Sequence, residues 1–358
     1  MVFIMSVPAL LKTSVEEKMT LFQRAPFPIY SHLYRVLKLH QMKKKSTREE
    51  WLTIINPNAG NGKGKKDWTR ISVLFSKNDI PVVSRFTERK GHAIEFAREG
   101  ISDGFRKIIS VGGDGTLNEV MNGIFTQEEV PPADIVTGMI PVGTGNDWGR
   151  MFGIPLVYEG AVEIIRENRQ TLHDIGVITY HEGNEKHQRY FINIAGLGFE
   201  ALVVSKTNRK KEKGKSSKAI YLYNLLSSLI AYRKVVADIT IDGRKTTSTI
   251  FSINVGNGRY CGGGMRQTPD ALPDDGMLDI TVIKDMSRFE IVRSLKLLYD
   301  GTILSHPKVD GYRSKELIVE SESLLYAEAD GESLGHTPCE FSIIPSAARI
   351  VYGTKLIQ

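Results

Sequence analysis

Residues 107–119 read KIISVGGDGTLNE, and this segment indicates how the chain folds. Its first five residues form an apolar run typical of a strand, and glycines then interrupt the run. Apolar side chains recur at helical spacing directly afterwards, at Leu117, Val120, Met121 and Ile124. The segment therefore predicts a strand over 107–111, a glycine loop and a helix over 117–125, an arrangement in which α/β sheets bind ligands.

The same alternation extends to both sides of this segment. Apolar strand patterns occupy 51–56, 81–86 and 135–141, and helical spacing occupies 67–78 and 92–99. A loop rich in Gly, Asn and Lys follows the first strand pattern and ends at Lys66. Strands that alternate with helices predict a mainly parallel sheet that is covered by helices on both faces.

The second half of the chain has a different pattern. Short β-rich runs punctuated by glycines lie at 174–179, 190–194, 236–241, 249–255, 278–283, 316–320 and 341–344. Helical patterns are fewer, at 220–234 and 289–299. This half therefore predicts a second, mostly antiparallel β domain of sandwich or barrel type, which begins near residues 165–175.

Residues 1–45 lie outside both patterns. They contain eight Lys or Arg and two Glu, so they carry the whole formal net charge of +6. A basic arm suits an anionic membrane surface, which an amphipathic helix over 30–42 would contact. A solvated, disordered tail and a true start at Met42 are the alternatives. The expected organisation is an arm over 1–45, an α/β domain over 46–170, a β-rich domain over 171–345 and a C-terminal segment over 346–358. One interpretation of this last segment is that it returns to the first domain.

The composition is that of an ordinary globular protein, with 41% hydrophobic and 25% charged residues among 358. No apolar run reaches the roughly 18–20 residues of a membrane-spanning helix, so none is expected. The two cysteines, Cys261 and Cys339, make neither a disulfide framework nor a zinc site. A reducing cytoplasm is the default compartment for such a chain.

Three loops follow strand patterns and supply groups that phosphate binding needs. They are NPNAGNGKG at 56–64, GGDGTLNE at 112–119 and PVGTGND at 141–147. Glycines let the backbone approach a phosphate, and Thr116 is placed to cap a helix and donate to a phosphate oxygen. Asp114 would repel a bare triphosphate, so it implies a metal ion. The first loop is not a Walker A loop, because no Gly-Lys-Ser/Thr follows at the required spacing, and a flexible glycine loop is the alternative for it.

In this order the three loops resemble the catalytic-domain family of the diacylglycerol kinases, which is similar to the sphingosine and ceramide kinases. The likeness covers residues 50–355. It continues in the second half at HDIG (173–176), GLGF (196–199), PD (269–270), DDG (274–276) and ADGE (329–332). The resemblance implies a two-domain kinase. An α/β domain like that of phosphofructokinases and NAD kinases would hold ATP, and a mostly antiparallel β-sandwich domain would help to bind a lipid in the cleft between them.

The resemblance also implies roles for individual residues. ATP and Mg²⁺ would be held by Asn56, Pro57, Gly60, Gly113, Asp114, Gly115, Thr116, Glu119, Gly143, Thr144 and Asn146. Asp147 and Asp174 would join Asp114 in a carboxylate and water network around the magnesium ion. A second, structural magnesium would bind the carboxylate of Asp275 and the carbonyl groups of Leu272 and Met277.

By the same resemblance, Asp330 would be the general base for the lipid hydroxyl, with Glu332 in support. A carboxylate within hydrogen-bond reach of an attacking hydroxyl takes its proton, while phosphoryl transfer otherwise needs alignment and charge neutralisation. Without the resemblance, Asp330-Gly331 is more simply interpreted as a hairpin turn, and so is the Asp-Gly pair at 275–276.

Three features concern the lipid. Glu200, directly after GLGF, is a candidate contact to the headgroup. The basic run over 206–218 would meet anionic headgroups, with an exposed loop as the alternative. The apolar helix over 220–230 would line an acyl-chain groove or belong to the core. The expected partners are a membrane lipid substrate and an anionic membrane surface, without nucleic acid, and edge strands allow a homodimer.

The predicted reaction transfers the γ-phosphoryl group of ATP to diacylglycerol, giving phosphatidic acid, in a cytoplasmic protein that binds the membrane peripherally. Another lipid (a sphingoid base, ceramide or a prenol), a soluble acceptor as in NAD kinases and a catalytically silent lipid-binding regulator are the alternatives. The GTGND and DGE segments argue against the NAD kinases, and the intact carboxylates argue against the regulator. No GxGxxG motif follows the first strand, which argues against a dinucleotide reductase.

Overall fold

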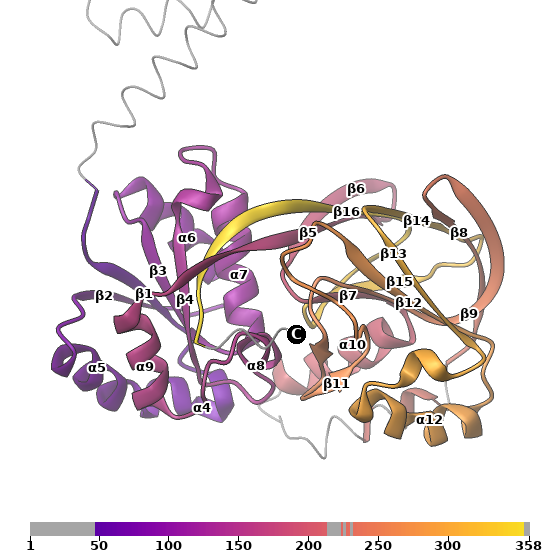
Figure 1. Cartoon of the computed structure of the whole chain (residues 1–358), viewed down its shortest axis with the longest axis horizontal. Helices are drawn as coiled ribbons and strands as arrows, with labels where there is room; N and C mark the ends of the chain where they lie inside the picture. Colours follow the sequence, from indigo (N-terminus) through magenta and orange to yellow (C-terminus); the bar gives the residue numbers. More distant parts are fainter. Residues whose placement is uncertain (1–46, 213–222, 225–226, 230–231, 354–358) are drawn as a thin grey trace, which may run out of the picture.

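The computed structural model describes residues 47–212, 223–224, 227–229 and 232–353. Within them the chain forms an α/β part, followed from Gln170 by a β-rich part (Figure 1). Several predictions lie outside the described residues: those for the N-terminal arm, for 213–218 of the basic run, for most of the helix over 220–234 and for residues 354–358.

Parallel strands form the centre of the first part: β1 (Trp51–Ile55), β2 (Val82–Phe86), β3 (Lys107–Gly112) and β4 (Val136–Pro141). Their order is β4-β3-β1-β2, and each neighbouring pair is parallel. Ile108 of β3 pairs with Leu52 of β1 and Thr137 of β4. The expected parallel sheet is confirmed, and the carboxyl ends of β1, β3 and β4 therefore lie at the same edge.

Helices cover both faces of these strands, as the alternation predicts. α6 (His92–Ser102) and α7 (Asp114–Phe125) pack against each other over β1 and β3. α5 (Trp68–Lys77) and α9 (Tyr158–Glu167) pack together on the other face (Figure 1). Right-handed crossovers require this division, because the chain moves in opposite directions along the sheet after β1 and after β2.

The loop predicted up to Lys66 needs a correction. It contains α4 (Ala59–Lys66), inside which Gly60, Asn61 and Gly62 have positive φ angles of 59°, 60° and 86°. Glycine and asparagine tolerate this left-handed geometry, which a regular helix does not contain. The loop interpretation therefore holds up to Gly62 and is wrong for 63–66, which form a helical turn.

The second part is mostly antiparallel, as expected. Its principal strands are β5 (Gln170–Glu182), β6 (Glu185–Phe191), β7 (Ile194–Gly198), β8 (Val235–Ile241), β9 (Arg244–Gly256), β12 (Leu278–Lys284), β13 (Val309–Ser314), β14 (Glu316–Glu320), β15 (Tyr326–Ala329) and β16 (Glu332–Val351). The pairs β5–β6, β7–β9, β8–β9, β9–β12, β12–β13 and β15–β16 are antiparallel. A small separate sheet pairs β10 (Tyr260–Cys261) with β11 (Met265–Arg266).

Two of the element predictions need correction, and one helix prediction is confirmed. The run over 190–194 is not one strand, because β6 ends at Phe191 and β7 begins at Ile194. The sequence patterns miss β13 and α10 (Phe199–Glu212) here and α8 (Asp147–Met151) in the first part. Because α10 extends to Glu212, residues 206–212 of the basic run are helical and not a loop. The predicted helix over 289–299 is α12 (Arg288–Asp300), which begins with a capping box between Ser287 and Glu290.

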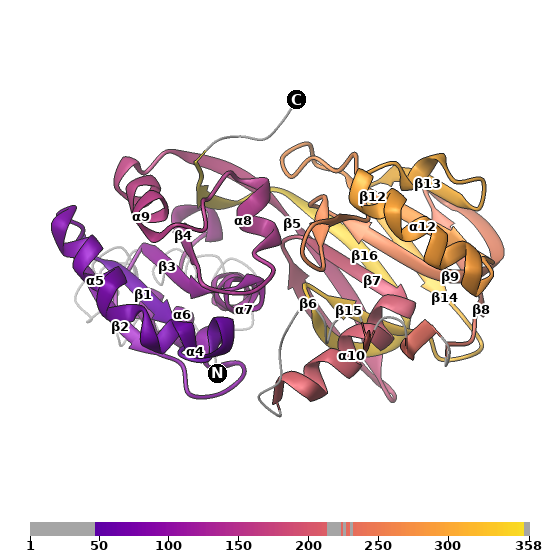
Figure 2. The same ribbon diagram turned by 90° about the horizontal axis from the view of Figure 1, so that it is seen from below.

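One long strand joins the two parts. β16 pairs with β5 along much of its length, with Phe341 opposite Ile178. Its last residues pair in parallel with β4 of the first part, where Arg349 lies opposite Val136. Figures 1 and 2 show β5 and β16 running together from the α/β part into the β-rich part. The hydrogen-bonded sheet is therefore continuous between the two parts.

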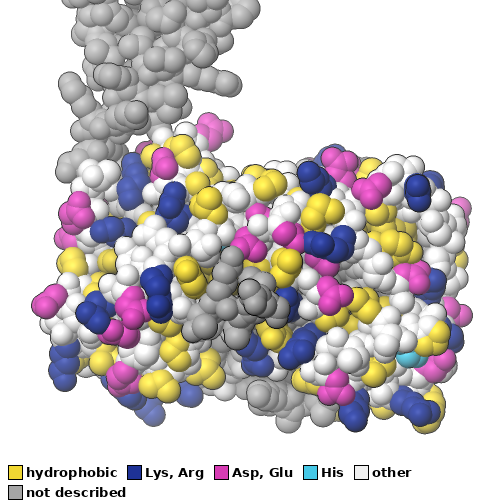
Figure 3. All heavy atoms as spheres, viewed as in Figure 1, with side chains coloured by type: hydrophobic (Ala, Val, Ile, Leu, Met, Phe, Trp, Pro, Cys, Tyr) yellow, Lys and Arg dark blue, Asp and Glu magenta, His cyan; other side chains and the backbone are white. Residues whose placement is uncertain are grey.

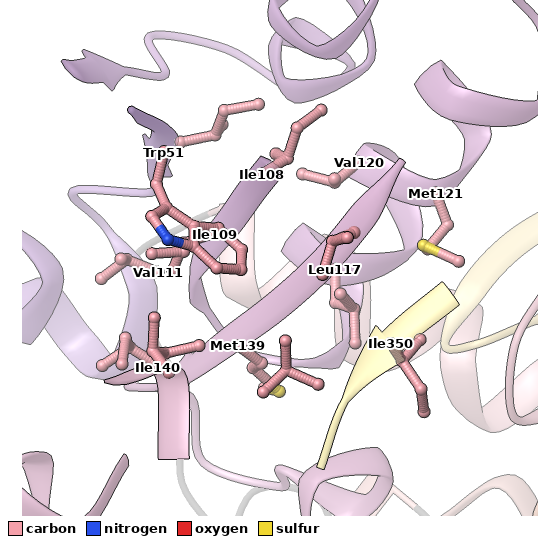
Figure 4. Close-up of a cluster of buried hydrophobic side chains, with 14 of the residues drawn as sticks. Trp51, Ile108, Ile109, Val111, Leu117, Val120, Met121, Met139, Ile140 and Ile350 are labelled. Carbon is pink, nitrogen blue, oxygen red and sulfur yellow. The ribbon is translucent and has the colours of Figure 1, made fainter. Parts of the chain in front are cut away.

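Each part has its own buried apolar cluster. In the first part the strands are apolar almost throughout, as expected for a parallel sheet that is covered on both faces. Figure 4 shows Leu117 and Val120 of α7 near Ile108 of β3, with Ile350 of β16 in the same cluster. The C-terminal strand therefore supplies part of the core of the first part.

The distribution of charged side chains on the surface and the state of the two cysteines agree with what the sequence suggests. Acidic and basic side chains are interspersed on the face seen in Figure 3, as the near-neutral balance after residue 45 suggests. Cys261 and Cys339 are both free thiols. Among the residues that the structure describes, no helix is long and apolar enough to span a bilayer.

Candidate active site

The three glycine loops meet at the carboxyl edge of the parallel strands. A side chain at Gly143, after β4, would place its Cβ 2.5 Å from Cα of Gly113, after β3. A side chain at Gly60, after β1, would overlap the carbonyl oxygen of Val142. No Cβ atom fits at such distances, so contact between the loops requires glycine at both positions. The structure thus brings the three predicted loops together.

Polar side chains tie these loops to one another. Asn56 donates through Nδ2 to Oγ1 of Thr116 over 3.1 Å. Thr116 lies in the first turn of α7 and does not cap it, because the N-cap is Gly113. Asn146 donates to the carbonyl of Gly143 over 2.7 Å, while its own Oδ1 is buried without a partner. A buried acceptor without a donor is unfavourable, so this oxygen suits a ligand or cation.

A cavity of about 550 Å³ opens beside the first loop, at the carboxyl ends of β1 and β2. It is lined by Pro57, Asn58, Lys65, Phe86, Thr87 and Glu88. Its volume lies in the usual range of ligand sites. Sequence reasoning identified Pro57 but missed 86–88, although a strand that neighbours β1 in a parallel sheet ends at the same edge. Thr144, in the third loop, is exposed.

Asp114 and Asp147 form a close pair of carboxylates. A side chain at Gly145 would meet Oδ2 of Asp114 at 3.0 Å and Oδ2 of Asp147 at 3.4 Å. Burial, together with the charge of Asp114, raises the pKa of Asp147 to about 6. Burial also raises the pKa of Asp114, although backbone N–H groups oppose the shift, including that of Trp148 at 3.0 Å.

These carboxylates fit a magnesium ion. Oδ2 of Asp147 accepts from the N–H of Gly263 over 2.7 Å, but its Oδ1 is buried without a hydrogen-bond partner, as is Oδ1 of Asn146. Mg²⁺ in kinases typically takes one or two carboxylates together with phosphate oxygens and water. No group of three or more His, Cys, Asp or Glu in the described part of the chain is placed to hold a metal by itself. Phosphate and water would therefore complete the ligand set.

Asp174 lies apart from this pair. It is fully buried on β5, and its carboxylate oxygens accept from the N–H groups of Ser346 and Gly276, each over 2.6 Å. Burial raises its pKa, with a smaller contribution from the charge of Asp275. The structure therefore brings two of the three expected network carboxylates together and places the third beside the loop after Pro273.

His173 links the Asp114–Asp147 pair to Asp174 through hydrogen bonds. Its Nε2 accepts from the indole N–H of Trp148 over 3.2 Å, and the backbone N–H of the same tryptophan binds Asp114. Its Nδ1 is hydrogen-bonded to the carbonyl oxygen of Asp174. Burial lowers the pKa of His173 to about 4, so the imidazole is neutral at physiological pH. Nδ1 therefore carries the proton, and the buried ring links α8 to β5 without adding charge.

The predicted structural magnesium does not fit the present arrangement of Asp275. One carboxylate oxygen accepts from the N–H of Met277 over 3.0 Å, and the other is paired with the guanidinium of Arg313. Arg313 also lies 3.6 Å from Asp279. An arginine already balances the charge that a second cation would need, and Leu272 and Met277 would add only neutral carbonyl groups.

Asp330 and Gly331 form the turn between β15 and β16. Their φ angles are 49° and 81°, which is typical of a two-residue hairpin, so the simpler interpretation of this Asp-Gly pair is correct about its geometry. The carboxylate nevertheless points into the junction of the two parts. It accepts four hydrogen bonds, from Nδ2 of Asn118 and from the backbone N–H groups of Ile192, Asn193 and Ile194. Burial outweighs these bonds and raises its pKa to about 6.

Glu332 and Glu119 lie near one another at the same junction. Glu332 forms an ion pair with Lys90, and its Oε1 lies 3.8 Å from where a side chain at Gly115 would stand. Glu119 accepts from two backbone N–H groups at the start of α6, over 2.9 and 3.2 Å. Burial raises the pKa of Glu119, and the charge of Glu332 adds to the shift.

Two more carboxyl groups, those of Glu200 and Glu328, lie close to one another in the β-rich part near Asp330. Glu200, the predicted headgroup contact, stands at the start of α10, and burial raises its pKa to about 7. Glu328 on β15 is buried and accepts from the N–H of Gly331 over 2.9 Å; burial raises its pKa well above the usual range. A side chain at Gly196 would contact both glutamates. Sequence reasoning missed Glu328, although its position two residues before Asp330 was a signal.

The sequence matches two family models and several named proteins. The diacylglycerol kinase catalytic domain matches residues 50–178, and the YegS C-terminal NAD kinase beta sandwich-like domain matches 193–352. The chain is 30% identical over 288 residues to a diacylglycerol kinase of Staphylococcus aureus (strain bovine RF122 / ET3-1), which spans 80% of this chain and 87% of the relative. It is 28% identical over 310 residues to a diacylglycerol kinase of Staphylococcus carnosus (strain TM300), which spans 85% of this chain and 97% of the relative.

A solved structure is also similar to this chain. The crystal structure of a candidate diacylglycerol kinase from Bacillus anthracis str. Sterne has a TM-score of 0.70 and 27% sequence identity, over 87% of this chain and 98% of that one. The glycine loops and the paired carboxylates thus lie in the part that matches the diacylglycerol kinase catalytic domain, and the Asp330 turn lies in the part that matches the YegS C-terminal domain. The chain belongs to the diacylglycerol kinase family.

Proposed function

We propose that this protein is an ATP-dependent lipid kinase that converts diacylglycerol to phosphatidic acid. One observation carries the proposal: Nδ2 of Asn118 lies 2.7 Å from Oδ2 of Asp330. Asn118 belongs to the helix that begins at the second glycine loop, and Asp330 belongs to the β-rich part. A candidate base is therefore held against the candidate phosphate site, and alignment of this kind is the main requirement of phosphoryl transfer. The printed names of the relatives support diacylglycerol as the acceptor.

The first part supplies the groups that would hold ATP. They are the three glycine loops and the residues of the cavity beside them. The start of α7, which no side chain caps, and the ammonium group of Lys65 are available to phosphate oxygens. Asp114 and Asp147 would hold the magnesium ion, which neutralises phosphate charge when it is bound. We assign residues 46–170 to the nucleotide and 171–345 to the lipid on this basis.

Asp330 is suited to the role of general base. With a pKa of about 6 it is ionised at neutral pH and still basic enough to take a proton from a hydroxyl group. Its carboxylate would accept the proton of the lipid hydroxyl as the hydroxyl oxygen bonds to the γ-phosphorus. The bond from that phosphorus to the bridging oxygen breaks, and ADP leaves with the electron pair. Glu332 adjoins the same turn and would hold it through the ion pair with Lys90.

A lipid acceptor requires peripheral contact with a membrane. We propose that the β-rich part makes this contact, with Glu200 near the lipid headgroup. Burial keeps the pKa of Glu200 near 7, so at neutral pH the carboxyl is partly protonated and can donate to a neutral acceptor lipid.

A phosphoryl-transfer assay tests the proposal. Labelled ATP, Mg²⁺ and the full chain are combined with mixed micelles that contain diacylglycerol, ceramide, sphingosine or undecaprenol in turn. Label is expected in phosphatidic acid alone. Label in another lipid would reject diacylglycerol as the acceptor and keep the lipid-kinase class. Bound ATP with no label in any lipid would contradict the class itself.

Asp330→Asn tests the base in the same assay. Asparagine keeps the shape of the turn but cannot take the proton, so kcat should fall by about 10²–10⁴-fold while the Kd for ATP stays nearly unchanged. Asp242→Asn is a matched control, because Asp242 and Gly243 form an Asp-Gly turn with similar φ angles, 49° and 74°, far from the glycine loops. Loss of ATP binding in the Asp330 variant, or an equal loss of activity in the control, would count against Asp330 as the base.

A further inference from the structure

The carboxylate of Asp330 is saturated by donors from the protein itself. Oδ1 accepts from the N–H groups of Asn193 at 3.0 Å and Ile194 at 3.1 Å. Oδ2 accepts from the N–H of Ile192 and from Nδ2 of Asn118, each at 2.7 Å. A carboxylate offers about four lone-pair positions, so all of them are taken. A substrate hydroxyl can deliver its proton to Asp330 only after one donor gives way.

The donors differ in their freedom to move. Three are backbone N–H groups in the connection from β6 to β7, where the chain is fixed by the pairing of both strands. The fourth is the side-chain amide of Asn118, which can rotate without moving the backbone. Its Nδ2 also lies 3.1 Å from the carbonyl oxygen of Tyr190, so the amide keeps one hydrogen bond when it releases Asp330.

We propose that the acceptor hydroxyl inserts between Nδ2 of Asn118 and Oδ2 of Asp330, so that Asn118 is the residue that closes and orients the base. In the inserted state the hydroxyl oxygen accepts from the amide and its proton is donated to the carboxylate. This inference rests on the proposed function of Asp330 as the base. It adds a second residue that places the attacking oxygen, and that residue belongs to the nucleotide part.

Arg189 fixes the orientation of this amide. Its guanidinium donates to Oδ1 of Asn118 over 2.7 Å, and Nδ2 of Asn122 donates to the same oxygen over 3.1 Å, which leaves Nδ2 of Asn118 to face Asp330. The reversed amide would place Oδ1 against the carboxylate and would be repelled. Arg189 is on β6 and Asn118 is on α7, so the contact crosses the junction of the two parts. A shift of α7 against β6 would therefore change how the base is held.

The proposal predicts a change in the pH dependence of catalysis. The charged groups around Asp330 are Glu328 and Glu332 on the two strands that flank it, Glu200, whose charge acts on Glu328, Glu119 and Arg189 across the junction, and Lys90, which is paired with Glu332. None of these glutamates is hydrogen-bonded to Asp330, whereas the amide of Asn118 is. The amide of Asn118 stabilises the ionised carboxylate and so lowers its pKa. Without the amide, a higher pH is needed to ionise the base.

Asn118→Ala is the test, with kcat measured from pH 5 to 9. The rising limb of the profile should move up by about one pH unit, because a hydrogen bond to a charged group is lost. Arg189→Met leaves Asn118 in place but frees its orientation, and a smaller shift in the same direction is expected. Asn122 donates to the same Oδ1 of Asn118, so Asn122→Ala should also give a smaller shift in this direction. Asp242→Asn, in the other Asp-Gly turn, is the control whose limb should stay in place. A limb that does not move in Asn118→Ala would overturn the proposal.

A titration that needs no kinase activity completes the test. The Asp330 carboxyl is followed by ¹³C NMR in protein labelled at aspartate, and Asp330→Asn identifies its signal. The midpoint should rise by about one unit in Asn118→Ala. An unchanged midpoint would overturn the inference even if the protein is an active kinase. A raised midpoint in a protein that phosphorylates no lipid would support the contact and reject the proposed function.

Discussion

Asp147 is only 4% exposed, and one of its carboxylate oxygens has no hydrogen-bond partner. Burial raises its pKa to about 6 from the usual 3.8. An acid whose pKa is higher in the folded state binds its proton more tightly there, so stability is full below the unfolded value, falls as the pH rises from about 4 to about 6, and stays lower above that. At about 1.4 kcal/mol per unit, ionised Asp147 costs on the order of 2–3 kcal/mol at neutral pH even with Arg150 at 4.0 Å from its Oδ1, unless a further cation balances it.

Asp147→Asn should therefore stabilise the protein and remove its response to magnesium. The midpoint of thermal unfolding is expected to rise by a few degrees at pH 8 and by less at pH 5, where much of the wild-type carboxyl is already protonated. Mg²⁺ should raise the midpoint of the wild-type protein but not that of the variant. Calorimetry measures both effects, and Asp79→Asn at an exposed position is the control. Equal stabilisation of both proteins by Mg²⁺ would reject Asp147 as a ligand.

The loops that connect strands to helices are the elements on which the site depends, and their glycines are not equivalent. Gly143 is held by backbone contact, because its Cβ would lie 2.5 Å from Cα of Gly113. Gly115 has room, since its Cβ would meet only Oε1 of Glu332 at 3.8 Å. One glycine is therefore required by loop packing, whereas the other leaves open space where phosphate is proposed to bind.

Gly143→Ala and Gly115→Ala should separate these two functions. The first should lower the free energy of unfolding by about 1–3 kcal/mol, as overpacking typically does. The second should leave stability nearly unchanged and weaken ATP binding, because its methyl group enters the proposed phosphate site. Urea unfolding and ATP titration of both variants make the comparison. Unchanged ATP affinity in Gly115→Ala would place the phosphates elsewhere.

Local patterns explain which elements the sequence predicts. β1 to β4 and their helices are short, periodic and separated by glycine loops, so each is recognisable by itself. β16 is not: its pairing with β5 shifts between His336 and Glu340 and again between Ile344 and Ala348. Burial alternates without a break from Gly335 to Phe341, but the buried positions before Phe341 carry Gly, Thr and Cys, and the alternation is lost near the second irregularity, so only 341–344 show an apolar strand pattern.

In the candidate site, too, some features carry a local sequence motif and others depend on contacts between distant residues. Its loops and the Asp330 turn carry local motifs, and a family resemblance points to them. The contact between Asn118 and Asp330 joins residues 212 positions apart, and only the folded chain brings them together. The place of Asp174 is also set by distant residues, since Ser346 and Gly276 bind it. Neither arrangement leaves a signal in the sequence near the residue itself.

In the whole molecule, the two parts share one strand. The end of β16 pairs with β4, and Ile350 is fully buried in the core of the first part (Figure 4). The β-rich part therefore cannot unfold through β16 without removing a side chain from that core. Such a shared strand couples the stability of the two parts and holds the Asp330 turn at a fixed place relative to α7.

Ile350→Ala should consequently destabilise both parts together, by about 2–5 kcal/mol, because it leaves a cavity in a packed core. Two probes report on the parts separately. Tryptophan fluorescence follows the first part, since all three tryptophans lie between Trp51 and Trp148, and thiol labelling of fully buried Cys339 follows the second. Both urea transitions should move to the same lower midpoint. Ile344→Ala, on the same strand but 38% exposed, should change either midpoint little. If the thiol of Cys339 stays protected while the fluorescence transition shifts, the two parts unfold independently, and β16 does not couple them.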